Sequence, residues 1–388
     1  MWPPRPPAAA RRLVRLLRSS SIQFPMTQTS SFASKRASKE WKEAKKVGAL
    51  QSYLYGSPGK KARFTASDIP SEDLWKDFWK DEQGPGDLSP EKCRLIAIRY
   101  CEVSVGEHAM KHPEKFMPAL LKEYNIDYDS FYMIALPLFF SKNINDVGTH
   151  MMYDLILMEH APSTLTMMRV AWRTALGNDY RDLQSSRVFR TCFSHFNRLL
   201  LSSQDPDVFT LKGLFVQLEG KGKGDHIALP YFDKAIKLSH TLPPSELTKT
   251  PAPGAGLDGV TDASAVVRKP RWSFEMSCHY GRGIALMRLD RKEEAIEAFR
   301  VAAVELNYAP ALVTLARLLP PDTPRGLLEA YLTSAAMTGM IEPAPLLAEL
   351  LASKAKDPAL SQAERRMAAQ LRNEWWIYVA QAGVPEAQ

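Results

Sequence analysis

Cysteine is scarce in this sequence of 388 residues. The four cysteines include no CxxC pair of the kind that binds zinc or carries redox chemistry. On one helix, Cys93 and Cys101 would lie about 12 Å apart along the axis, which is too far for a disulfide. We therefore expect buried free thiols, which are typical of a reducing compartment. The four residues are Cys93, Cys101, Cys192 and Cys278.

Long apolar runs and strand signals are also missing. The longest apolar candidate, residues 131–140, contains Pro137 and falls short of the roughly 18 residues that a membrane-spanning helix needs. No segment alternates apolar and polar residues with a β-branched bias, and no Asn-Gly pair indicates a hairpin. These absences argue against both a transmembrane segment and a sheet.

Acidic residues are absent from the first 39 positions, where the first acid to follow is Glu40. Eight basic residues lie in this segment, and without them 42 basic residues face 43 acidic ones. Cleavage nearer Ser20 would instead leave a balance of +2. The formal charge of +7 therefore comes from the N-terminus, and the remainder lacks the excess positive charge that a strong phosphate-binding surface needs.

The same segment has the composition of a mitochondrial targeting sequence. Residues 8–20 read AAARRLVRLLRSS, in which leucines can share one helix face while arginines occupy the other. An amphipathic, Arg-rich and Ser-rich stretch without acids is typical of a mitochondrial transit peptide; a disordered basic tail is the alternative. With the reduced thiols, residues 1–39 predict import into the mitochondrion and favour the matrix.

Helical periodicity covers most of the remaining chain. Residues 40–88 are predicted to be a linker with short amphipathic helices, at 40–55 and around the apolar turn LWKDFWK. From Ser89 a helical domain follows as far as residue 206, with start signals at Ser89-Pro90, 127–130, 143–146, 162–163 and 205–207. A second helical region spans 207–388, and its Pro-rich residues 241–270 are predicted to be a disordered insertion. We therefore predict an all-α fold.

An internal repeat gives this fold a specific architecture. Three segments each carry a small residue or Leu, then a large residue, then Ala, at positions i, i+4 and i+7. The second and third segments are offset by 33 residues. The small residues let two helices of a hairpin approach closely, and the large residue fills the gap to the next hairpin. The predicted packing residues are Gly213, Ala228, Phe232, Ala235, Gly283, Ala295, Phe299, Ala302, Leu332 and Ala335.

This pattern resembles the tetratricopeptide repeat and its Sel1-like relative over residues 207–388. Gly283, Ala295, Phe299 and Ala302 carry the resemblance, which implies an α-solenoid of stacked helical hairpins. The chain departs from the tetratricopeptide pattern where His279 and Arg282 stand in place of Trp and Leu. Families with such repeats bind peptides or proteins in a concave groove, so the resemblance implies a protein partner.

No catalytic, cofactor or metal constellation emerges from the remaining polar residues. The glycine-rich residues 219–224 lack the spacing of a phosphate-binding loop, and no strand precedes them. His108 and His112 have no third metal ligand at a diagnostic spacing. Cys192 and His195 lie among phenylalanines and indicate core packing, not a nucleophile. We predict a non-enzymatic protein without a cofactor.

One helix offers a local basic face. Arg187, Arg190 and Arg198 alternate with phenylalanines in RVFRTCFSHFNR, which is the best candidate for an RNA or partner patch. The competing interpretation is a solvated face over an apolar core.

Two functional hypotheses remain. The first is a mitochondrial scaffold or adaptor that binds protein partners in the assembly or biogenesis of a respiratory-chain or mitoribosomal complex. The second is an organellar RNA-binding or translation-support factor built on a helical-repeat body. The charge balance favours the first, because RNA binding needs clustered positive charge.

Overall fold

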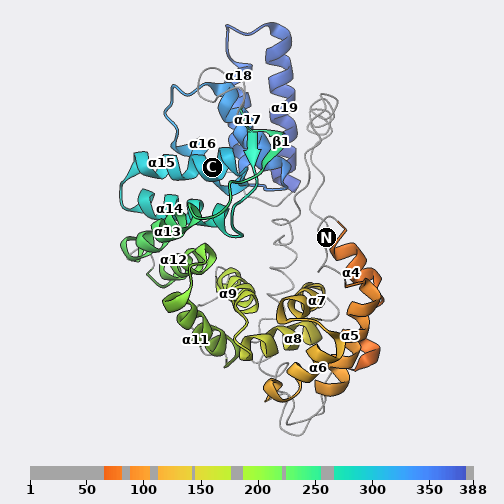
Figure 1. Ribbon diagram of the computed structural model, residues 1–388. Helices are drawn as coiled ribbons and strands as arrows, with labels where there is room; N and C mark the ends of the chain where they lie inside the picture. The colour runs from red at the N-terminus through yellow and green to blue at the C-terminus, as the bar shows by residue number, and fades with distance from the viewer. Residues whose placement is uncertain are drawn as a thin grey trace. The chain divides into compact units, whose positions relative to one another are not determined.

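The computed structural model describes residues 65–80, 88–104, 112–141, 145–175, 187–220, 224–254 and 266–381 (Figure 1). The expected transit peptide and the helix expected at 40–55 lie outside these ranges. The described residues fall into two compact units, which divide between Gln204 and Asp205. The boundary predicted from the sequence lies two residues further along the chain.

The N-terminal unit consists of helices in its described part. Its elements are η2 (Ala66–Asp68), α4 (Asp73–Phe78), α5 (Pro90–Ser104), η4 (Pro113–Lys115), α6 (Met117–Tyr124), α7 (Tyr128–Phe140), α8 (Asn145–Leu157), α9 (Ala161–Ala175) and α11 (Arg187–Ser202). Consecutive long helices pack on one another from α7 to α11.

Helix starts in this unit follow the capping signals of the sequence. The hydroxyl of Ser89 accepts the backbone N–H of Lys92 at 3.2 Å, in the first turn of α5. The carboxylate of Asp127 accepts the N–H of Ser130 at 2.7 Å and so caps α7. Each cap satisfies a backbone donor that would otherwise have no partner.

The short helix α4, which contains most of the apolar turn LWKDFWK, is docked on the body of its own unit. The Trp75 side chain is fully buried, and its Nε1–H donates to the carbonyl of Ile134 in α7 at 3.2 Å. A buried indole with its N–H satisfied anchors a helix that is too short to be stable alone.

In its described residues the C-terminal unit is a stack of four helical hairpins (Figure 1). The hairpins are α12 (Pro206–Gly220) with α13 (Asp225–Ser239), α14 (Glu275–Arg288) with α15 (Lys292–Arg300) and its π-helical extension η5 (Val301–Glu305), α16 (Ala309–Leu318) with α17 (Arg325–Met337), and α18 (Pro343–Ala355) with α19 (Gln362–Gln381). The second helix of each of the first three hairpins packs on the first helix of the next. The predicted all-α solenoid is confirmed.

The prediction that residues 241–270 form a disordered insertion is wrong for the described residues, which include two strands. Strand β1 (Leu247–Pro251) pairs antiparallel with β2 (Val266–Arg268), so that Leu247 lies opposite Arg268 and Pro251 opposite Val266. Between these two pairs β1 contains more residues than β2 does, so the ladder is irregular. The sequence does not alternate here, and a side chain helps to hold the strands, since Thr248 Oγ1 donates to the Val267 carbonyl at 2.6 Å.

Candidate functional site

The repeat-packing residues lie at the helix contacts of the stack. A Cβ added to Gly213 of α12 would lie 2.6 Å from Cε1 of Phe232 in α13. A Cβ added to Gly283 of α14 would lie 2.7 Å from Cε1 of Phe299 in α15. Each glycine therefore leaves room for the phenylalanine ring of its partner helix. The other predicted residues are buried as well, namely Ala228, Ala235, Ala295, Ala302, Leu332 and Ala335.

A third glycine, which the repeat pattern did not identify, shares the contact with Phe232. A Cβ on Gly281 would lie 2.8 Å from Cζ of that ring. The Phe232 ring of α13 therefore faces the first helices of two hairpins, α12 and α14, and is fully buried. Gly281 and Gly283 are two residues apart, so they point to different sides of the helix. This spacing is the signal that could have suggested contacts with two different rings.

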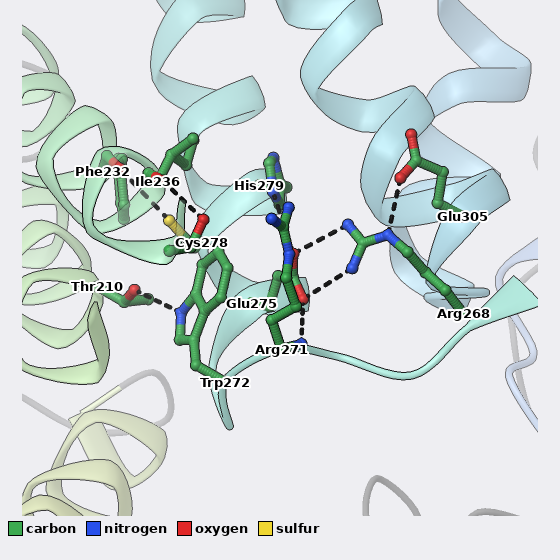
Figure 2. Close-up of polar contacts among 11 residues, drawn as sticks. Thr210, Phe232, Ile236, Arg268, Arg271, Trp272, Glu275, Cys278, His279 and Glu305 are labelled. Carbon is green, nitrogen blue, oxygen red and sulfur yellow. Dashed lines mark hydrogen bonds and ion pairs between the residues drawn. The ribbon is translucent and has the colours of Figure 1, made fainter. Parts of the chain in front are cut away.

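Polar side chains of α12 also connect the first two hairpins. The Asp207 carboxylate accepts the backbone N–H of Phe274 at 2.8 Å, just before α14. The Gln217 amide donates to the carbonyl of Gly281 at 2.8 Å. The Trp272 indole N–H is directed at the hydroxyl of Thr210 at 3.4 Å (Figure 2). Buried polar groups cost stability when left unpaired, so these contacts fix the relative position of α12 and α14.

A buried ion cluster lies at the start of α14 (Figure 2). The Glu275 carboxylate has no exposed surface and receives two hydrogen bonds from the guanidinium of Arg268, at 2.9 and 3.0 Å. The backbone N–H of Arg271 donates a third at 2.6 Å. Arg268 also donates from Nε to Glu305 of η5 at 2.9 Å. The cluster thus joins β2, α14 and η5.

The histidine of this cluster carries no charge at neutral pH. Burial lowers the pKa of His279 to about 4, although the nearby Glu275 carboxylate opposes this shift. Its Nε2 lies 3.9 Å from that carboxylate and has no hydrogen-bond partner. Two arginines, Arg268 and Arg271, therefore face two carboxylates in a balanced arrangement. Such balance suits a structural anchor, since an uncompensated buried charge would destabilise the fold.

The basic face of α11 does not gather three free arginines. The backbone of Arg187 begins the helix, while the Arg190 side chain is exposed. Arg198 pairs with Glu159 at 3.0 Å. A shallow hollow is lined by Arg190, Thr191, Ser194 and His195. On the opposite side Phe189, Cys192 and Phe196 are buried, as expected for a solvated face over an apolar core.

The cysteines are the described candidates for nucleophilic chemistry. All four cysteines are free and buried. Burial raises the pKa of the Cys192 thiol to about 12, so this group is a thiol at neutral pH. His112 lies 2.8 Å from Glu114, whereas His108 and residues 221–223 of the glycine-rich segment fall outside the described residues.

Two absences apply to the described part of the chain. No group of three or more His, Cys, Asp or Glu side chains there is placed to hold a metal ion. None of its helices combines the length and apolar character needed to cross a membrane.

A buried carboxyl–phenol pair joins two helices of the N-terminal unit. The Tyr100 hydroxyl of α5 donates to Asp154 of α8 at 2.7 Å, and both side chains are buried. Burial raises the pKa of Asp154 to about 7, although the hydrogen bond from Tyr100 opposes the shift. The pair is therefore sensitive to pH near neutrality.

No protein-family model matches the chain, and neither the curated proteins nor the solved structures include a significant match.

Proposed function

We propose that the chain is a tetratricopeptide- or Sel1-like adaptor of the mitochondrion, which binds a protein partner through its hairpin stack. The observation that carries this proposal is the repeated glycine–phenylalanine packing, Gly213 with Phe232 and Gly283 with Phe299, within consecutive hairpins. Stacked hairpins offer an extended surface for a partner, and this is their usual role in repeat proteins. The function that we assign is assembly or biogenesis of a respiratory-chain or mitoribosomal complex.

The distribution of charge supports a protein partner over RNA. Beyond residue 39 the numbers of basic and acidic residues differ by one. Several exposed arginines of the C-terminal unit are paired, for example Arg291 with Glu294 at 2.6 Å and Arg300 with Glu297 at 2.8 Å. RNA binding would need unpaired positive charge along a surface. The hollow beside Arg190 is the observation that favours the RNA alternative.

The mitochondrial part of the proposal rests on residues 1–39. Their arginines, serines and lack of acids support import. Fusing these residues to a fluorescent protein should direct it to mitochondria. Replacing Arg11, Arg12, Arg15 and Arg18 by glutamate should leave the fusion in the cytosol, and mitochondrial delivery of that variant would contradict this part of the proposal.

The partner itself is accessible by affinity purification. Tagged full-length chain is recovered from gently lysed mitochondria, with and without ribonuclease, and the bound proteins and RNA are identified. We expect a defined set of proteins that survives ribonuclease and changes little with salt. Partners that vanish on digestion, or an affinity that falls steeply with salt, would replace the adaptor by an RNA-binding factor.

A further inference from the structure

The connection between α13 and α14 is much longer than the geometry of the stack requires. Residues 306–308 suffice between η5 and α16, and residues 338–342 between α17 and α18. Residues 240–274 make the corresponding connection after α13. Helices in bundles are usually joined by about 2–8 residues, so this segment has a use beyond joining two hairpins.

The first part of this connection crosses to the third hairpin. We call residues 247–254 the strap. Its Ala252 is 4% exposed and belongs to the apolar core formed by the second and third hairpins. Gly254, with φ +78°, lies against Leu327 and Tyr331 of α17, where a Cβ would collide with Leu327 Cδ1. The strap begins with β1, which is drawn in Figure 1.

The strap has the features of a bound peptide. It is extended through β1, and Pro251 and Pro253 fix φ and favour extended backbone in the residues before them. A small residue then enters the apolar core, and a glycine makes the turn that a side chain would block. Leu247 remains 71% exposed, so the contact of the strap with the stack is concentrated at its C-terminal end, around Ala252 and Gly254.

Both ends of the strap are tied to the stack. At one end residues 240–246 link it to α13, and further along the chain strand β2 carries Arg268, which is bound to Glu275 and Glu305. Because the strap is part of the same chain, it is present at its binding surface at a high effective concentration, which is in the millimolar range for short linkers. A weak contact of its own is then sufficient to keep the surface occupied.

We propose that the surface around Leu327 and Tyr331 recognises extended, proline-containing peptides, and that the strap occupies it as an internal ligand. The partner segment would carry a small residue between two prolines, followed by glycine, as Pro251-Ala252-Pro253-Gly254 does. This inference rests on the proposed adaptor function only in assigning such a segment to a partner. Release of the strap opens the site for that segment.

The test uses a fluorescein-labelled peptide of residues 244–254, PSELTKTPAPG, and fluorescence anisotropy with the full-length chain. Ala252→Glu in the protein places a carboxylate in an apolar contact and should expel the strap. We expect this variant to bind the peptide at least about tenfold more tightly than the unchanged protein, because the tethered competitor is gone. A peptide that itself carries Ala252→Glu should bind neither protein.

Leu247→Glu is the matched control, since it makes the same charge change on the exposed part of the strap. It should bind the peptide no better than the unchanged protein does. Circular dichroism melts establish that each variant is folded. Should Ala252→Glu unfold, the titration is repeated with Gly254→Val, which opposes the strap by backbone strain at positive φ and leaves the ion cluster intact.

Equal peptide binding by the unchanged and strap-released proteins, or no binding to the folded released variant, would overturn the proposal. Neither result depends on a mitochondrial partner. A failure here therefore leaves the adaptor function standing, whereas a failed affinity purification leaves the strap site standing.

Discussion

Replacing Gly283 by alanine should destabilise the C-terminal unit, even though alanine is the better helix former. The new methyl group would lie 2.7–2.8 Å from three atoms of the Phe299 ring, which is fully buried. Overpacking of this kind costs about 1–3 kcal/mol, and contact with three ring atoms at once places this site in the upper half of that range. The higher helix propensity of alanine offsets about 1 kcal/mol of this loss.

The net loss is therefore about 1–2 kcal/mol in the free energy of unfolding. For a unit of this size, about 2–4 °C of melting temperature corresponds to each kcal/mol, so the expected shift is roughly 2–8 °C downward. Thermal melts followed by circular dichroism measure it. Gly220→Ala is the control, because nothing lies within 4 Å of a Cβ at that position. It should not lower the melting temperature.

A double variant separates steric conflict from other effects. Phe299→Leu alone should destabilise by removing ring contacts, but it also removes the atoms that the new methyl group meets. Gly283→Ala combined with Phe299→Leu should therefore lose less stability than the sum of the two single losses. A Gly283→Ala variant as stable as Gly220→Ala, or additive losses in the double variant, would refute the glycine–phenylalanine contact.

Three further predictions concern charged groups. Arg268→Ala should cost about 3–5 kcal/mol in urea unfolding, because it leaves the Glu275 carboxylate buried without its main partner; Arg268→Met with Glu275→Gln should lose much less. The raised pKa of Asp154 means that the folded state holds this proton more tightly than the unfolded chain does, so the contribution of Asp154 to stability is fully present below about pH 4 and is lost as pH rises through about 7. Asp154→Asn should remove this loss, on the order of 4 kcal/mol, and equal pH profiles of the two proteins would contradict the burial argument. Arg190→Glu should leave recovery of protein partners unchanged, whereas reduced recovery would implicate the α11 hollow in binding.

The repeat architecture was predictable because its signals are local and periodic. Ala295 and Phe299 are four residues apart, so a helix places them on one face, and the offset of 33 residues repeats the pattern in the next hairpin. Caps such as Asp127 are equally local, since the side chain bonds to a backbone group three residues away. Signals of this kind can be read from one sequence.

The strands were not predictable from the same information. Strand β1 has no alternation, and its partner β2 has three residues. Strand β2 is held partly by the pairing of Arg268 with Glu275, seven residues away, and with Glu305, 37 residues away. A contact over such a separation leaves no periodic trace, and the richness of the segment in proline and glycine favours disorder when it is considered alone.

One of the two departures from the repeat pattern, His279, lies against the anchored connection. The tetratricopeptide pattern has apolar residues at the positions of His279 and Arg282, where the first helix of a hairpin faces its neighbours. Here His279 packs on the ring of Trp272, with centroids 6.2 Å apart, beside the buried Glu275. Arg282 reaches Asp233 of α13 at 2.8 Å. Trp272 belongs to the connection, whereas Asp233 belongs to α13, so His279 contacts the connection and Arg282 joins the two helices α13 and α14.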